Sequence, residues 1–178
     1  RSNYCFTTTA LTSKVWLIYE DDAGEWQAKA VADIGDASKI PLPVDISISA
    51  DDNHLWINTW NDGLVRLYDI SDPFAPTQVM QKQIGEQVNM VSQSWDGERV
   101  YFTSSLLASW DKTTASEGND LQYFKLYNWD GESLTPEFNL DFIELGLGAP
   151  HQMRFGAHAL YGGTSAQSPS GLGMPPAH

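Results

Sequence analysis

The sequence predicts an all-β fold of the β-propeller type, and two observations lead to this prediction. Residues 42–84 contain four short apolar or aromatic runs separated by turn residues, which is the size and content of one four-stranded blade. The turn-then-strand pattern DDNHLW at 51–56 returns as DGERVY at 96–101, 45 positions later. A weaker third copy, SKVW, lies at 13–16.

These copies make about two and a half to three blades, whereas a closed propeller has about four to eight. We therefore expect residues 1–161 to form the C-terminal blades of a larger closed propeller, with the first blade entered part-way. Residues 162–178 are rich in Gly, Ser and Pro, and this composition predicts a loose tail.

The blade at residues 42–84 is defined by its alternation and its turns. Asn61, Asp62 and Gly63 tolerate the positive φ of a hairpin reversal, and Pro73 interrupts the ladder because it lacks an N–H. The period-two alternation of a half-buried strand places on one face Leu42, Val44, Ile46 and Ile48. Applied along the whole chain, the same signals predict strands at 4–9, 14–20, 26–34, 42–48, 55–60, 64–70, 76–84, 89–94, 99–106, 121–129 and 138–142.

The connections carry fewer signals than the strands. Residues 107–120 form a long polar loop, and loops of this length are where binding residues concentrate. Residues 35–40 are expected to link two blades, and residues 143–146 can hold a single turn. No amphipathic helix is predicted.

Composition excludes several classes of partner. The formal net charge is −13, which argues against nucleic acid or an anionic membrane surface because phosphate contacts need clustered Lys and Arg. No apolar run approaches the roughly 20 residues of a membrane span. Cys5 is the single cysteine, so no internal disulfide can form. Residue 1 is Arg and no signal-peptide pattern follows it, so we expect a piece of a longer or processed chain.

Histidines and one carboxylate are the residues to weigh for chemistry. His54 lies in a polar turn and His178 ends the tail, which are solvated positions. His151 follows a turn and is either a metal ligand or a strand-edge histidine bonded to a backbone carbonyl. His158 is seven residues away, roughly 23 Å when extended, so the two reach one metal only if the chain doubles back. Asp45, on the polar face of its strand, either lines the propeller channel or forms an ion pair or turn cap.

Four segments in order, KIPLPVDISISADDNHLWINTWNDGLVRLYDISDP, DGERVYFTSSLLASWDK, PEFNLDF and GAPHQMRF, carry a resemblance over about residues 5–155. They resemble the C-terminal portion of the selenium-binding protein family, whose bacterial members include methanethiol oxidase. The resemblance implies a copper-binding propeller enzyme that converts methanethiol, O2 and water to formaldehyde, hydrogen sulfide and hydrogen peroxide. Its partners would be a small volatile thiol and O2.

The resemblance also assigns residues. His151 matches the histidine of the family's Ala-His-Glu element and would be one copper ligand, while the family's other ligand histidines lie in its N-terminal half. Gln152 stands where the family has glutamate. Cys5 lies near a family cysteine; we expect it to be a buried structural residue, with selenium or thiol binding as the alternative. Family positions are also matched by Asp45, which would line the channel, and by three residues that would either face substrate or brace a loop: Trp110, Asp111 and Lys112.

Two classes of function remain open at this point. The first is the C-terminal part of a copper-dependent methanethiol oxidase, expected to be inactive without the N-terminal half of the propeller. The second is a non-catalytic propeller binding module, or a thiol- or selenium-binding protein acting through Cys5. The resemblance favours a periplasmic location, and the cytoplasm is the alternative.

Overall fold

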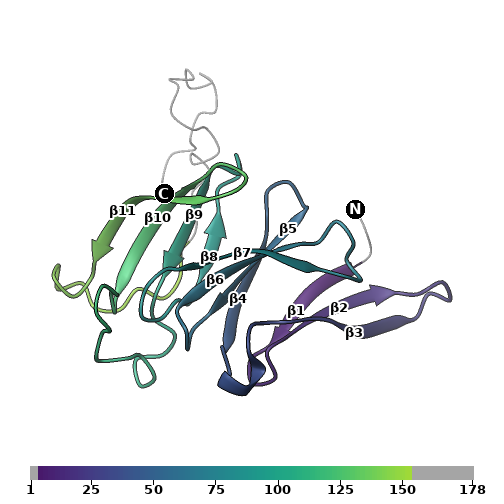
Figure 1. The fold of residues 1–178 in the computed structure, drawn as a ribbon, viewed down its shortest axis with the longest axis horizontal. Coiled ribbons are helices and arrows are strands. Elements are labelled where there is room, and N and C mark those ends of the chain that lie inside the picture. The colour runs from purple at the N-terminus through teal and green to yellow at the C-terminus, as the bar shows by residue number, and fades with distance from the viewer. Residues whose placement is uncertain (1–3, 154–178) are drawn as a thin grey trace, which may run out of the picture.

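The computed structural model describes residues 4–153 and shows three antiparallel β-sheets arranged side by side (Figure 1). The first sheet has the order β1-β2-β3, the second β4-β5-β6-β7, and the third β8-β9-β10-β11. The strands are β1 (Tyr4–Thr9), β2 (Lys14–Glu20), β3 (Trp26–Asp33), β4 (Pro43–Ile48), β5 (His54–Thr59), β6 (Leu64–Asp69), β7 (Thr77–Gln83), β8 (Val91–Gln93), β9 (Arg99–Thr103), β10 (Tyr123–Trp129) and β11 (Leu134–Asp141). Each sheet is one blade, so the predicted partial propeller is confirmed.

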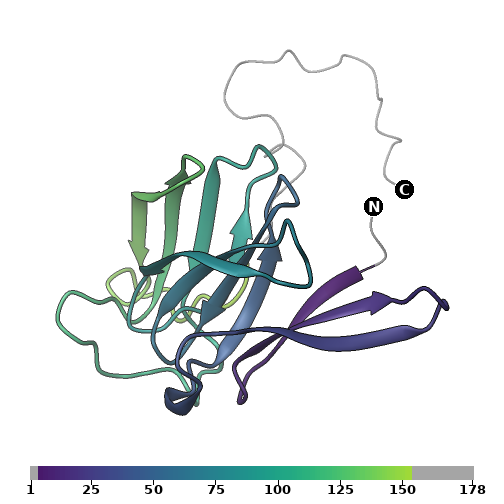
Figure 2. The same cartoon turned by 45° about the vertical axis from the view of Figure 1, so that its right-hand side comes forward.

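The first strands of the blades lie beside one another. β1 contacts β4, and β4 contacts β8, which is the radial packing of a propeller around its axis. Figure 2 shows the first blade extending away from the other two. This blade has its inner strand, β1, and is incomplete at the outer edge, beyond β3. The predicted two and a half to three blades agree with the one three-stranded and two four-stranded sheets of the described residues.

The sequence repeat has an atomic counterpart in the hairpin turns. In the second blade the Asp51 carboxylate accepts hydrogen bonds from Ser49 Oγ and, at 3.1 Å, from Asn53 N, while Ser49 Oγ accepts from His54 N at 2.9 Å. In the third blade Ser94, Asp96, Glu98 and Arg99 make the same set of bonds. The predicted repeat is thus one turn geometry used twice.

Several strand boundaries differ from the expectation, for identifiable reasons. In β4 a bulge between Pro43 and Asp45 shifts the register, and Ile48 is 43% exposed, so the predicted apolar face does not run the full length of the strand. β11 begins at Leu134, before the predicted residue 138. The link at 35–40 contains a short 3₁₀ helix, η1 (Ala37–Lys39), whose N-cap Asp36 accepts from Ser38 N at 3.0 Å.

Two hydrophobic cores fill the gaps between the blades. One lies between the second and third blades and includes Trp56, Leu67, Phe102 and Tyr127. The other lies between the first and second and includes Leu17, Ile57 and Tyr68. Because β5 and β6 contribute to both cores, the second blade is the part of the described structure that is covered on both faces. No helix among residues 4–153 is long and apolar enough to cross a bilayer.

Candidate functional site

The last described residues fold back onto the end of β9. Ser105 N donates to Pro150 O at 2.9 Å, and Thr103 Oγ1 donates to His151 O at 2.8 Å. These two bonds fix the backbone of His151 at one rim of the third blade. The fold determines the position of the imidazole, whose neighbour Asn89 is 62 positions away in the sequence.

The His151 ring has a defined tautomer. Its Nδ1 lies 2.8 Å from Ser105 O, and an unprotonated Nδ1 would bring two lone pairs together at that distance. Nδ1 therefore carries the proton and donates it to the carbonyl, which leaves the lone pair on Nε2. His151 is exposed, so this nitrogen is available to a metal. A ligating histidine that donates its other N–H to a backbone carbonyl is the usual arrangement in metal sites.

Asn89 lies behind the histidine and holds the carbonyl that orients it. Its Nδ2 donates to Ser105 O at 2.5 Å, and it is fully buried. Because Nδ2 and the protonated Nδ1 of His151 are both donors, their separation of 3.1 Å is a contact and no hydrogen bond. Asn58 on β5 in turn donates to Asn89 O at 2.9 Å. A chain of amides thus links His151 to the second blade, and the sequence contained no local signal for it.

Asp111 braces the loop that follows β9. Its Oδ1 accepts from Leu106 N at 2.9 Å, and its Oδ2 accepts from Ser105 Oγ at 2.6 Å and from Gln122 Nε2 at 3.0 Å. Ser105 therefore contacts Asp111 through its side chain and His151 through its backbone. Trp110, the preceding residue, is 58% exposed.

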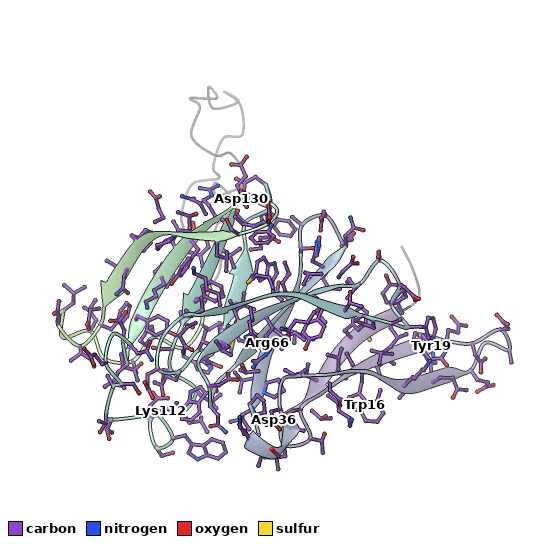
Figure 3. All side chains as sticks on the ribbon, in the orientation of Figure 1. Trp16, Tyr19, Asp36, Arg66, Lys112 and Asp130 are labelled. Atoms are coloured by element: carbon purple, nitrogen blue, oxygen red, sulfur yellow. The ribbon has the colours of Figure 1, made fainter. Side chains whose placement is uncertain are left out.

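Lys112 joins this loop to the second blade, and Figure 3 shows it at the lower edge of the molecule. Its Nζ donates to Asn61 O and Glu86 O, each at 2.8 Å, and lies 3.5 Å from the Glu86 carboxylate. A hydrogen bond from Ser116 N, and others from Ser116 and Asn119 side chains, hold the pKa of Glu86 below its ordinary value. The structure thus gives both Asp111 and Lys112 protein partners that fix the loop beside His151.

Asp45 connects the inner strands of two blades. Its Oδ2 accepts from Val91 N on β8 at 2.7 Å, across 46 positions of sequence. The carboxylate is half-buried, and it satisfies a backbone donor at the start of an inner strand. This contact is a strut between the second and third blades, a role that the sequence did not suggest.

Replacing Asp45 with alanine is expected to lower the free energy of unfolding by about 1.5–3 kcal/mol, the usual cost of losing a hydrogen bond to a charged group. Urea denaturation measures this. Asp45→Asn keeps an acceptor oxygen and is expected to retain most of the stability. If alanine and asparagine are equally stable, the bond to Val91 is not what Asp45 contributes.

Cys5 is exposed on β1, in the first blade. The expectation of a buried structural cysteine is wrong, because the alternation of β1 buries Phe6 and turns Cys5 to the opposite, uncovered face. His151 is held against the third blade, so the two residues belong to different parts of the fold. His54 is the first residue of β5. His158, His178 and the predicted tail lie outside the described residues.

Residues 4–153 do not contain a metal site with three ligands of their own. No group of three or more His, Cys, Asp or Glu side chains is close enough within this range to hold a metal ion. His151 fits the role of one imidazole ligand whose partners come from elsewhere.

Comparison with known proteins assigns the family. A family model described as 56 kDa selenium binding protein (SBP56) matches residues 1–160. The chain belongs to the selenium-binding protein family. Within this family it is 67% identical over 160 residues to a methanethiol oxidase of Ruegeria pomeroyi, covering 90% of the chain and 36% of that protein. It is 60% identical over 153 residues to a methanethiol oxidase of Hyphomicrobium sp., covering 86% of the chain and 34% of that protein.

This selenium-binding family chain therefore spans about a third of the length of those two relatives. Among solved structures, a hypothetical selenium-binding protein from Sulfolobus tokodaii matches 75% of the chain and 36% of its own length, with a TM-score of 0.61 at 30% identity. The β-propeller domain of Myceliophteria thermophila Cps50 (Swd1) matches 80% of the chain and 42% of its own length, with a TM-score of 0.57 at 10% identity. The second likeness shows the propeller fold alone.

Proposed function

We propose that this chain is the C-terminal part of a methanethiol oxidase that converts methanethiol, O2 and water to formaldehyde, hydrogen sulfide and hydrogen peroxide. The observation that carries the proposal is the orientation of the His151 ring. Its Nδ1–H donates a hydrogen bond to Ser105 O at 2.8 Å, so the lone pair of Nε2 remains for a metal. Two relatives named methanethiol oxidase, 67% and 60% identical, support it.

In this proposal His151 supplies one nitrogen ligand to copper, and the remaining ligands come from the rest of the propeller. Imidazole nitrogen suits copper. Copper would supply the one-electron chemistry needed because O2 reacts slowly with a closed-shell thiol. The residues of this chain hold His151 at a fixed position and in one tautomer. Without the other ligands the chain alone is expected to be inactive.

Gln152 does not remove the support for the imidazole. The family's glutamate at this position could orient the ligand histidine, and an amide there would weaken that role. Here the Ser105 carbonyl accepts the hydrogen bond from Nδ1–H at 2.8 Å, and the Gln152 side chain is exposed. The orientation of His151 therefore rests on β9 and Asn89, and glutamine at position 152 is compatible with copper.

Asn89→Ala is expected to weaken copper binding about 10- to 100-fold, the usual cost of removing a group that orients a ligand. Asn89 anchors the Ser105 carbonyl at 2.5 Å, so its loss frees the imidazole to turn. The measurement is a competition titration of copper in the complete protein, with circular dichroism to verify folding.

The matched control is Asn128→Ala. Asn128 is an exposed asparagine on β10 whose Nδ2 donates to Glu137 Oε2 at 2.8 Å. It is expected to leave copper affinity unchanged. Equal affinity in the Asn89 and Asn128 variants would contradict the positioning role.

The oxidase function is tested by incubating the complete protein with methanethiol and O2, with and without copper, and measuring the three products. Equal amounts of formaldehyde, sulfide and peroxide, formed only with copper, are expected. A complete, copper-loaded protein that consumes no methanethiol would leave the alternative, a propeller module that binds without catalysis.

A further inference from the structure

We propose that the wedge between the second and third blades binds a small organic cation that carries methyl groups, such as a quaternary ammonium ion. The wedge is a cavity of about 350 Å³, within the range of small-molecule sites. Its lining includes the turns before β5 and β9, at the rim marked by Asp130 in Figure 3, opposite Lys112. It is therefore separate from His151, which lies at the other end of β9.

Three indole rings form the walls of the wedge. Trp56 is fully buried, and Trp129 contacts it edge-on, with ring centroids 5.0 Å apart and an interplanar angle of 81°. Trp95, which is 71% exposed, lines the mouth. Trp56 backs the wall, while the half-buried Trp129 and the exposed Trp95 offer a methylated cation aromatic surface, which is the basis of recognition by aromatic cages.

The two sides of the wedge are held together by Gln93. Its Oε1 accepts from Ala50 N at 3.0 Å and from Trp56 Nε1 at 3.4 Å, and its Nε2 donates to Gly97 O at 2.7 Å. These bonds join the turn of the second blade to that of the third, so the cavity is formed before any ligand arrives. They also provide a partner for the N–H of the buried Trp56.

The charge of the wedge selects a cation. Its lining contains Asp51, Asp96 and Glu98, and the residues that line it include no lysine or arginine. Hydrogen bonds from Ser94 and Glu98 N, together with Arg99, hold the pKa of Asp96 below its ordinary value, so the carboxylate is ionised near neutral pH. Arg99 pairs with Asp96 at 2.5 Å and offsets one charge. The remaining negative charge attracts a cation, and the indole walls favour one with an apolar, weakly hydrated surface.

The test is calorimetric titration of tetramethylammonium chloride into the complete chain, at constant ionic strength so that screening does not change. Saturable binding is expected for tetramethylammonium and none for tert-butanol, which has a similar shape and no charge. Trp95→Ala is expected to weaken binding about three- to thirtyfold, the range of one cation–π contact. Since Trp95 is exposed, this variant should fold normally.

Two further variants test whether the change in binding is specific to the wedge. Glu98→Gln is expected to weaken binding about two- to fivefold through the lost charge, whereas Trp110→Ala, an exposed tryptophan at the opposite rim, should leave it unchanged. The proposal is overturned by no saturable binding, by equal binding of tert-butanol, or by a Trp95→Ala variant that binds as well as the parent.

Discussion

His151→Ala in the complete protein is expected to abolish stoichiometric copper binding and to lower methanethiol oxidation by at least about 100-fold. Nε2 of His151 carries the lone pair that is available to a metal, since Nδ1–H donates its hydrogen bond to Ser105 O at 2.8 Å. A metal centre that loses one of its few ligands loses both affinity and the geometry on which its reactivity depends. Elemental analysis gives the copper content, and product formation gives the rate.

His54→Ala is the matched control for this experiment. His54 is the first residue of β5, where its ring is 3.5 Å from the Asp51 carboxylate, at the rim opposite to His151. The variant is expected to retain copper and activity. Full copper content in the His151 variant would show that the metal is bound elsewhere, and the proposed site would be abandoned.

Gly63→Ala is expected to reduce the free energy of unfolding by about 2–5 kcal/mol. Gly63 has φ +65°, and a left-handed conformation costs a residue with a Cβ about 1–2 kcal/mol. A Cβ at this position would lie 2.1 Å from the backbone oxygen of Gly85. A backbone atom cannot relieve this clash by changing a side-chain rotamer. Forcing atoms into a filled space adds about 1–3 kcal/mol.

Gly118→Ala separates the two terms. Gly118 also has a positive φ, +79°, but an added Cβ would meet nothing within 4 Å. It should therefore show only the conformational cost of about 1–2 kcal/mol. Denaturant unfolding of both variants gives the comparison. If both variants lose the same free energy of unfolding, the steric clash between position 63 and Gly85 contributes nothing to the loss.

The turn chemistry shows why much of the fold could be predicted. The repeat at 51–56 and 96–101 reflects a local bonding pattern in which one carboxylate closes a tight turn, as Asp51 and Asp96 do. Such patterns depend on a few neighbouring residues, so they are visible in sequence. The outer strand β11 was predicted too short because its first half contains Pro136, which pairs with Tyr127 at a bulge. Packing against β10 overrides the weak local signal there.

The candidate site was only partly predictable. His151 was identified through the family motif, and its sequence position left a metal ligand and a carbonyl-bonded histidine as alternatives. The structure shows that the two are compatible, because bonding the carbonyl through Nδ1 leaves Nε2 for the metal. Asn89 and Ser105 could not be found, since they are 62 and 46 positions from His151 and no local pattern connects them to it.

By itself the sequence determined the strands, the turns, the blade repeat and the family, because these depend on alternation and on residues adjacent in the chain. The tertiary structure decided which residues meet across blades: Asp45 with Val91, Lys112 with Asn61 and Glu86, and the three indoles of the wedge. It also turned Cys5 outward. The physical reason is that radial packing brings together side chains from separate sheets, and no local pattern encodes the neighbour that a blade will face.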